Sequence, residues 1–210
     1  MTGQGNGDSG RRNEQSARRL GEVLLRTVGE LGYHQTTVGD ILERSGEPSV
    51  RFYQHYSNKE DCFLAAYERV AGELTERMLA AGRRGATWCQ GLTQALSELL
   101  DFVASEPLLA AALIVEVRAV KNGAAAHDEI LSRLADTIES ARYQPDARSS
   151  IPVIVAPLMV GAVEGYLRQM LVRGEAEQAP DVLAGFVFLF VLNYFGEEAA
   201  FEAMDNANDR

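Results

Sequence analysis

The chain has 210 residues, of which 46% are hydrophobic, and a formal net charge of -10. A chain of this length can bury a hydrophobic core without covalent support. Cys62 and Cys89 are its only cysteines, too few and too far apart for a disulfide framework or a thiolate metal site. We therefore expect free thiols and a reducing compartment.

Charge is distributed unevenly along the chain. Residues 1–60 hold eight of the 20 lysines and arginines and eight of the 30 aspartates and glutamates, so this segment is neutral and the remainder carries the whole -10. An anionic partner would have to meet the first segment, because the remainder would repel it.

Neither a membrane span nor a signal peptide is predicted. The longest strongly apolar stretch, residues 151–167, contains two prolines and Glu164 and is shorter than the roughly 20 residues that a spanning helix needs. Residues 1–14 are polar and rich in glycine, which predicts a disordered arm. A cytoplasmic protein is expected.

Periodicity and capping residues predict the first helices. Apolar residues recur at helical spacing from Glu14 to Leu31. Thr37 and Asp40 are typical of a capping box, which opens a short helix that Gly46 ends. A second short helix follows over residues 48–55, because proline suits the first turn of a helix.

A second capping box is expected at Ser57 and Glu60, and it would open a longer helix that continues to about Ala80. Two short helices that are joined by a tight glycine turn and braced by longer ones form a helix-turn-helix pattern.

The rest of the chain also reads as helical, with no alternating strand pattern and no fixed repeat, so we predict an all-α fold. The further helices are expected over residues 90–104, 107–120, 128–142, 150–173 and 181–195. The expected division is a disordered arm (1–14), a helix-turn-helix domain (15–63), a connecting helix (64–82), a helical ligand-binding and dimerisation domain (83–200) and an acidic tail (201–210).

The short helix near residue 50 separates its side chains by direction. Phe52 and Tyr56 are four residues apart and are expected in the core. The opposite face of the helix, away from the core, then presents the hydroxyl of Ser49, the methyl groups of Val50, the phenol of Tyr53 and the amide of Gln54. These groups suit a DNA major groove, where glutamine pairs with adenine and apolar groups contact thymine. Arg51 and His55 could add guanine or phosphate contacts, although His55 could equally be packed.

Lys59 lies in the first turn of its predicted helix, where the helix dipole makes a cation unfavourable by roughly 0.3–1 kcal/mol. A bound phosphate would reverse this effect, because free N–H groups and the ammonium would converge on one anion. Thr36 or Thr37 could serve a second phosphate in the same way. Such contacts position a protein on DNA without reading its sequence.

Residues 15–63, approximately, resemble the DNA-binding domain of the TetR family of transcriptional regulators. The resemblance is carried by the segment TTVGDILERSG, by Phe52 to Tyr56 in the short helix after it, and by Ser57 to Glu60. The resemblance implies a three-helix DNA-binding domain, a helical ligand-binding domain and a homodimer whose recognition helices enter successive major grooves. It also implies DNA contacts from Ser49, Val50, Arg51, Tyr53, Gln54 and His55, with phosphate anchors at Thr37, Tyr53 and Lys59.

Three residues depart from the family pattern. Glu47 stands where a buried aliphatic residue is usual, Pro48 where a capping serine is frequent, and Arg51 where a small threonine is common. Arg51 either adds a base contact or compensates for the acidic Glu47.

The second domain offers a candidate ligand pocket. Glu116 and Glu164 lie in apolar helical segments, where a carboxylate is costly to bury without a partner. Each could orient a cationic or hydroxylated ligand, or pair with an arginine such as Arg118 or Arg168. Pocket-lining or core positions are also expected for Trp88, Phe102, Met159 and Tyr166.

Small residues on the last two long helices would let these helices approach a symmetry mate closely. A dimer interface is therefore expected around Gly161, Gly165, Ala184 and Gly185, with a monomer core as the alternative.

Two functions are compatible with these patterns. The first is a dimeric DNA-binding repressor that a small molecule releases from operator DNA, and the second is a helical carrier or enzyme without DNA binding. The sequence contains no catalytic motif and no phosphate-binding glycine loop, and its three histidines are scattered, so no enzyme activity, cofactor or metal is expected.

Overall fold

The computed structural model describes residues 5–148 and 150–208, and over these residues it is entirely helical, which confirms the predicted all-α class. Ten α-helices and three short 3₁₀ helices occur in this part of the chain: α1 (Gly5–Leu31), α2 (Val38–Ser45), α3 (Ser49–His55), α4 (Lys59–Gly82), α5 (Trp88–Ser105), α6 (Pro107–Ile114), η1 (Glu116–Ala119), α7 (Gly123–Glu139), η2 (Ser140–Tyr143), α8 (Val155–Arg173), η3 (Ala176–Val182), α9 (Leu183–Phe195) and α10 (Glu197–Asn208).

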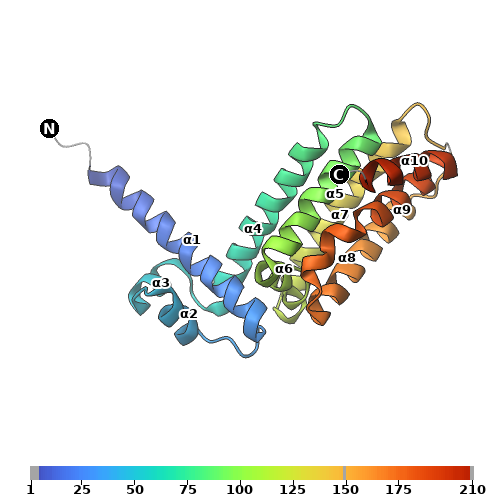
Figure 1. Cartoon of the computed structure of the whole chain (residues 1–210). Helices are drawn as coiled ribbons and strands as arrows, with labels where there is room; N and C mark the ends of the chain where they lie inside the picture. Colours follow the sequence, from blue (N-terminus) through green and yellow to red (C-terminus); the bar gives the residue numbers. More distant parts are fainter. Residues whose placement is uncertain (1–4, 149, 209–210) are drawn as a thin grey trace.

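The first three helices and the start of α4 enclose a small core. Each contributes a fully buried side chain, namely Leu24 from α1, Ile41 from α2, Phe52 from α3 and Phe63 from α4. Figure 1 shows α2 and α3 at one end of the molecule, beside α1 and away from the bundle that the later helices form. The helix α4 runs from this small domain into that bundle.

The first helix begins earlier than the sequence predicts. A disordered arm is expected over residues 1–14, but residues 5–14 form the first turns of α1, and residues 1–4 lie outside the described part. Extending an existing helix adds one hydrogen bond for each residue fixed, whereas starting one is costly. This difference explains how a polar, glycine-rich segment continues the amphipathic helix behind it.

The cap of α2 is the predicted one. The Thr37 hydroxyl accepts a hydrogen bond from the Asp40 backbone N–H at 3.2 Å, and the Asp40 carboxylate accepts one from the Thr37 backbone N–H at 2.7 Å. These reciprocal bonds confirm the capping box. Gly46 ends the helix with a φ of 68°, a left-handed conformation that glycine adopts without steric cost.

The cap of α4 differs from the prediction by one position. The Asn58 side chain accepts from the Asp61 backbone N–H at 2.9 Å, so Asn58 replaces the expected Ser57. The Asp61 carboxylate in turn accepts from the Ser57 backbone N–H at 2.9 Å, so the pairing with Glu60 is wrong. Asparagine caps as well as serine does, and propensity alone does not separate neighbouring candidates.

The second domain is a bundle in which α4, α5, α7, α8 and α9 lie side by side (Figure 1). The single helix predicted over residues 107–120 is divided into α6 and η1. Residues 201–208 of the expected acidic tail belong to α10, where Ala203 and Ala207 are buried; residues 209–210 lie outside the described part. Alanines at helical spacing let α10 pack closely on α9 despite its acidic composition.

The two domains meet most closely where α1 crosses α6. A Cβ atom placed on Gly29 of α1 would lie 1.9 Å from the carbonyl oxygen of Leu108 in α6, closer than any real contact. Only glycine permits this approach of two backbones.

One segment, Ala176–Phe195, is long and apolar enough to span a membrane by length and composition alone, with a mean hydropathy of 1.4. It includes η3 and α9, and α9 packs one face into the bundle through Val187, Phe190 and Tyr194. Core helices commonly have this composition.

Candidate nucleic-acid interface and effector cavity

The surface of α3 carries a compact set of exposed side chains. Phe52 is fully buried, as predicted, and holds the helix against the small core. Val50 and Tyr53 are 65% and 61% exposed. Ser49, Arg51 and Gln54 are also exposed. The outer face of α3 therefore offers hydroxyl, methyl, guanidinium, phenol and amide groups together.

Tyr56 and His55 lie at the end of α3 and are half-buried. The Tyr56 hydroxyl donates to the Ala17 carbonyl of α1 at 3.0 Å, and burial raises its pKa to about 12. The His55 Nε2 atom is buried and makes no hydrogen bond with the residues that the structure describes. Tyr56 thus fastens α3 to α1, as its predicted core position implies.

Lys59 has partners that its sequence position does not reveal. Its ammonium donates to the carbonyl oxygens of Tyr33 at 2.6 Å and Thr36 at 2.7 Å, and it lies 4.0 Å from the centre of the Tyr33 ring. Partial burial lowers its pKa from the ordinary lysine value. The side chain therefore ties the segment between α1 and α2 to the start of α4.

The threonines before α2 are also engaged. The Thr37 hydroxyl donates to the Asp40 carboxylate at 2.7 Å, and the buried Thr36 hydroxyl donates to the Gly32 carbonyl at 2.9 Å. Thr37 remains exposed, whereas Thr36 is 1% exposed and faces inward. Of the two, Thr37 is the one that an external partner could reach.

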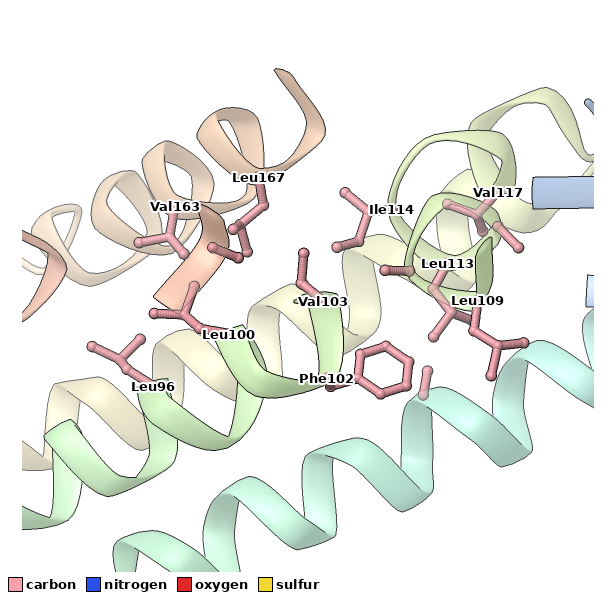
Figure 2. Packing of buried hydrophobic residues seen from close by; sticks show 14 of the residues in the cluster. Leu96, Leu100, Phe102, Val103, Leu109, Leu113, Ile114, Val117, Val163 and Leu167 are labelled. Carbon is pink, nitrogen blue, oxygen red and sulfur yellow. The ribbon is translucent and has the colours of Figure 1, made fainter. Parts of the chain in front are cut away.

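A cavity of about 150 Å³ lies in the second domain among α4, α5, α7 and α8. Its lining on α4 extends from Tyr67 to Leu79, a distance of about 18 Å at 1.5 Å per residue. Figure 2 shows packed core side chains of α5, α6 and α8; among those labelled, Leu96, Ile114 and Leu167 line this cavity. The cavity is therefore long, narrow and almost wholly apolar.

Polar groups gather where Tyr67 lines the cavity. The Tyr67 hydroxyl lies 2.9 Å from Nδ1 of His127, and Nε2 of His127 lies 3.4 Å from a carboxylate oxygen of Glu164. Arg118, in η1, lies 3.5 Å from the same oxygen. His127 and Tyr67 are 5% and 1% exposed, so these two side chains are shielded from bulk water, whereas the Arg118 side chain is 41% exposed.

The family model for bacterial regulatory proteins of the tetR family matches residues 22–66, which include α2, α3 and the start of α4. This segment belongs to the TetR family. The matched segment is the one that places the exposed side chains of α3, and the family is one of regulators rather than enzymes.

One curated relative is also a regulator protein. The fatty acid metabolism regulator protein of Bacillus subtilis (strain 168) is 27% identical over 97 residues, or 46% of this chain. The match spans 50% of that relative's length.

Two solved structures have the same fold. FadR from Bacillus halodurans, a fatty acid degradation regulator, superposes with a TM-score of 0.76 at 14% identity, covering 84% of this chain and 94% of that one. FadR from Bacillus subtilis in complex with stearoyl-CoA superposes with a TM-score of 0.73 at 20% identity, covering 82% and 96%. At such identities the likeness shows the fold alone.

The structure divides the six predicted pocket residues into two groups. Phe102 and Glu164 line the cavity. The others lie elsewhere: Trp88 packs against Phe195 with ring centres 5.5 Å apart, Met159 is buried in the core outside the lining, and Tyr166 is 46% exposed.

Glu116 also lies away from the cavity, because it turns toward the DNA-binding domain. Its carboxylate accepts a hydrogen bond from the Tyr33 backbone N–H at 2.7 Å. An arginine partner was the alternative expected from sequence, and the backbone donor that it finds instead is 83 residues away.

Sequence reasoning missed Tyr67 and His127 as cavity residues. Tyr67 is spaced like a core residue of α4, and His127 stands alone in its segment. Their partners are 60 and 37 residues distant, so no local pattern could indicate them.

Three of the four predicted interface residues, the glycines, have open space around the backbone. A Cβ placed on Gly161, Gly165 or Gly185 would meet nothing within 4 Å, and Ala184 is half-buried. Exposed apolar side chains accompany them on α8, with Leu158 at 61% and Val172 at 67%.

Proposed function

We propose that this TetR-family chain is a cytoplasmic, sequence-specific DNA-binding repressor that acts as a homodimer and leaves its operator when an apolar small molecule binds. The observation that carries the proposal is the exposed face of α3, which lies inside the segment that matches the family model. The strongly acidic remainder of the chain would repel DNA, which favours docking through this end alone.

In this proposal α3 enters the major groove and reads base edges. Gln54 would pair with adenine and Val50 would contact a thymine methyl group, while Ser49, Arg51 and His55 would add base or backbone contacts. Tyr53 would bind a phosphate through its exposed hydroxyl, together with Thr37 at the start of α2.

Lys59 would retain its proposed phosphate contact in addition to its contacts within the chain. An ammonium has three protons, and the carbonyl oxygens of Tyr33 and Thr36 accept two of them. The third can bind a phosphate, whose negative charge would also be stabilised by the first turn of α4.

The cavity supports a ligand that controls DNA binding. Its long apolar wall suits an elongated apolar molecule, and a related protein of the same fold has been solved with stearoyl-CoA. We expect Phe102 and Glu164 to contact this effector, together with Tyr67 and His127.

The short helix η1 connects the cavity with the DNA-binding domain. Arg118 of η1 contacts Glu164 at the cavity, and Glu116 of the same helix accepts from the Tyr33 N–H beside Lys59. A ligand that moves Glu164 would therefore change the position of η1 and of the segment before α2. The ligand would act through its different affinities for the two arrangements.

The homodimer would form through α8 and α9. The open backbone around Gly161, Gly165 and Gly185, with the exposed apolar residues on α8, gives a surface that a second copy can cover. A two-fold dimer would present two copies of α3 to paired half-sites.

A mobility-shift assay tests the DNA-reading role. DNA fragments that the purified protein retains at moderate salt are compared with random DNA of equal length. We expect Gln54→Ala to weaken binding to the retained fragment by about 1–3 kcal/mol and to leave random DNA almost unchanged. Lys59→Met should weaken both, because a phosphate contact carries no sequence information.

Gln178→Ala, an exposed glutamine in η3, is the matched control and should bind both DNAs as the wild type does. Equal losses on both DNAs for Gln54→Ala would show that this side chain does not read bases.

A further inference from the structure

A second hollow lies at the end of the bundle away from the DNA-binding domain. This outer hollow has a volume of about 390 Å³ and is lined by the end of α4, the turn between α4 and α5, the start of α5, the end of α7 and η2. Figure 1 shows the turn between α4 and α5 far from α2 and α3. The outer hollow is larger than the cavity of about 150 Å³, which we call the inner cavity.

The outer hollow continues the inner cavity on three helices. Six residues line both spaces, namely Met78 and Leu79 of α4, Leu92 and Ala95 of α5, and Thr137 and Ile138 of α7. On each helix these residues stand at the end of the inner cavity that lies away from Tyr67 and the DNA-binding domain. The two spaces are therefore neighbours end to end, with these side chains at the junction.

The junction is also the accessible end of the inner cavity. Thr137 is the only exposed residue among the described residues that line the inner cavity. At the opposite end, Tyr67, Phe102 and His127 are 1%, 5% and 5% exposed. Met78 at the junction has an unbranched, flexible side chain that can move aside. A ligand would therefore reach the inner cavity through the outer hollow.

The outer hollow has polar side chains with unused donors. Arg83, Ser140 and Gln144 line it and are exposed or half-buried. Their side chains make no hydrogen bond with residues 5–148 or 150–208, and each can donate at least one. Arg83 is the only charged residue among the described residues of this lining. An anionic group is therefore favoured here, whereas an ammonium would meet a positive charge and no carboxylate.

The inner cavity suits a chain and not a polar end. It extends about 18 Å along α4, and its lining is almost wholly apolar. The hydroxyls of Thr75 and Thr137 already donate to carbonyl oxygens of their own helices, at 2.8 and 3.0 Å. A polar group that moved inside would lose its hydrogen bonds with water, which is costly.

We propose that an elongated amphiphile with an anionic end enters through the outer hollow, keeps that end beside Arg83 and extends its chain into the inner cavity toward Tyr67. This inference rests on the proposed function, in which the inner cavity is the effector site. It fixes the direction of the effector, whose polar end lies away from the DNA-binding domain.

Photolabelling of the full-length protein tests this direction. The two probes are octanoate with a diazirine at carbon 3 and octanoate with a diazirine at carbon 7, and mass spectrometry locates the labelled residues. We expect the carbon-3 probe to label residues 83–88 and 140–144, and the carbon-7 probe to label residues 71–78 and 130–134. The reverse pattern, the same pattern for both probes, or no labelling of either space would overturn the inference.

Titration calorimetry tests the charge of the polar end. Octanoate should bind the wild type roughly threefold to fivefold more tightly than octanamide, and octylammonium should bind most weakly. Arg83→Gln should lose the preference for octanoate. Arg84→Gln is the matched control, because Arg84 is an exposed neighbour that lines neither space, and it should keep the preference. Equal preferences in the two variants would contradict the role of Arg83.

Blocking variants test the route. Thr137→Trp and Ser140→Trp place an indole at the junction and in the outer hollow, and each should weaken octanoate and octanamide at least tenfold. Asp136→Trp changes an exposed residue outside both linings and should bind as the wild type does. Wild-type affinity in both blocking variants would overturn the route.

DNA release by octanoate is measured separately by mobility shift. A protein that is labelled in the expected direction but never leaves its DNA would contradict the proposed regulation and leave the direction of binding intact. Release of DNA with the reverse labelling pattern would support the proposed regulation and overturn the direction.

Discussion

His127 is a titratable side chain whose surroundings oppose its charge. Burial lowers its pKa from the ordinary value of about 6.5, and this effect exceeds the opposite one of its hydrogen bond to Glu164. Tyr67, Arg118 and Asp128 are the other ionisable groups around it. The side chain is therefore neutral at physiological pH, as the network with Tyr67 requires.

This lowered pKa predicts a pH-dependent stability. The unfolded chain takes up the proton first as pH falls, so the stability is complete above about pH 6.5 and is lost below it, by at most about 1.4 kcal/mol per pH unit. Urea denaturation at roughly pH 7.5 and pH 5.5 should show a smaller loss for His127→Gln than for the wild type. The exposed His34→Gln should behave as the wild type, and identical pH dependence in all three proteins would contradict the assignment.

Lys59 illustrates how tertiary contacts change the meaning of one residue. From sequence alone it is a cation in an unfavourable place, the first turn of a helix, which suggests a phosphate partner. The structure supplies the carbonyl oxygens of Tyr33 and Thr36 and the Tyr33 ring. Two independent reasons therefore exist for a lysine here, one of stability and one proposed for DNA binding.

At the scale of helices, the crossing of α1 and α6 joins the two domains. We expect Gly29→Ala to destabilise the protein by about 1–3 kcal/mol, because its Cβ would force the α6 backbone away. Gly72→Ala in α4 is the matched control, since a Cβ there meets nothing within 4 Å, and it should be neutral or stabilising by up to about 1 kcal/mol. Urea unfolding of both variants measures the difference, and similar values would refute the close approach.

The helix η1 makes a second contact between the domains. It interrupts the helix that sequence predicts over residues 107–120, directly after α6. Its side chains Glu116 and Arg118 point to different domains, toward Tyr33 and Glu164 respectively.

At the scale of the whole molecule, the exposed small residues of α8 predict how two copies meet. Gly161→Arg should leave the monomer folded, because open space surrounds that position, but should block close approach of a second copy. Light scattering after gel filtration should then show a monomer, with weaker binding to the retained DNA. Gly72→Arg in α4 should remain a dimer, and an unchanged dimer for Gly161→Arg would move the interface to another surface.

The distribution of charge also belongs to the whole molecule. The segment with the α3 face is neutral and the remainder is acidic. A dimer would place two such ends toward DNA and keep its acidic bodies away from it, so DNA affinity should depend on salt mainly through the few contacts of the reading ends.

Local features could be predicted from the sequence by itself. The all-α class, the cap of α2, the end of α2 at Gly46, the burial of Phe52 and the exposure of Gln54 all depend on residues a few positions apart. Helical hydrogen bonds and helical periodicity have that same short range, which explains the agreement.

Only the tertiary structure decided which distant residues meet. The cavity joins Tyr67, His127 and Glu164 from three helices, and the domain contact joins Glu116 to Tyr33 across 83 residues. Such pairs depend on how packed helices are rotated and placed relative to one another, and a repeat of 3.6 residues carries no information on that. For this reason the sequence indicated Glu164 as a carboxylate in an apolar helix, but its contacts with His127 and Arg118 emerged only from the fold.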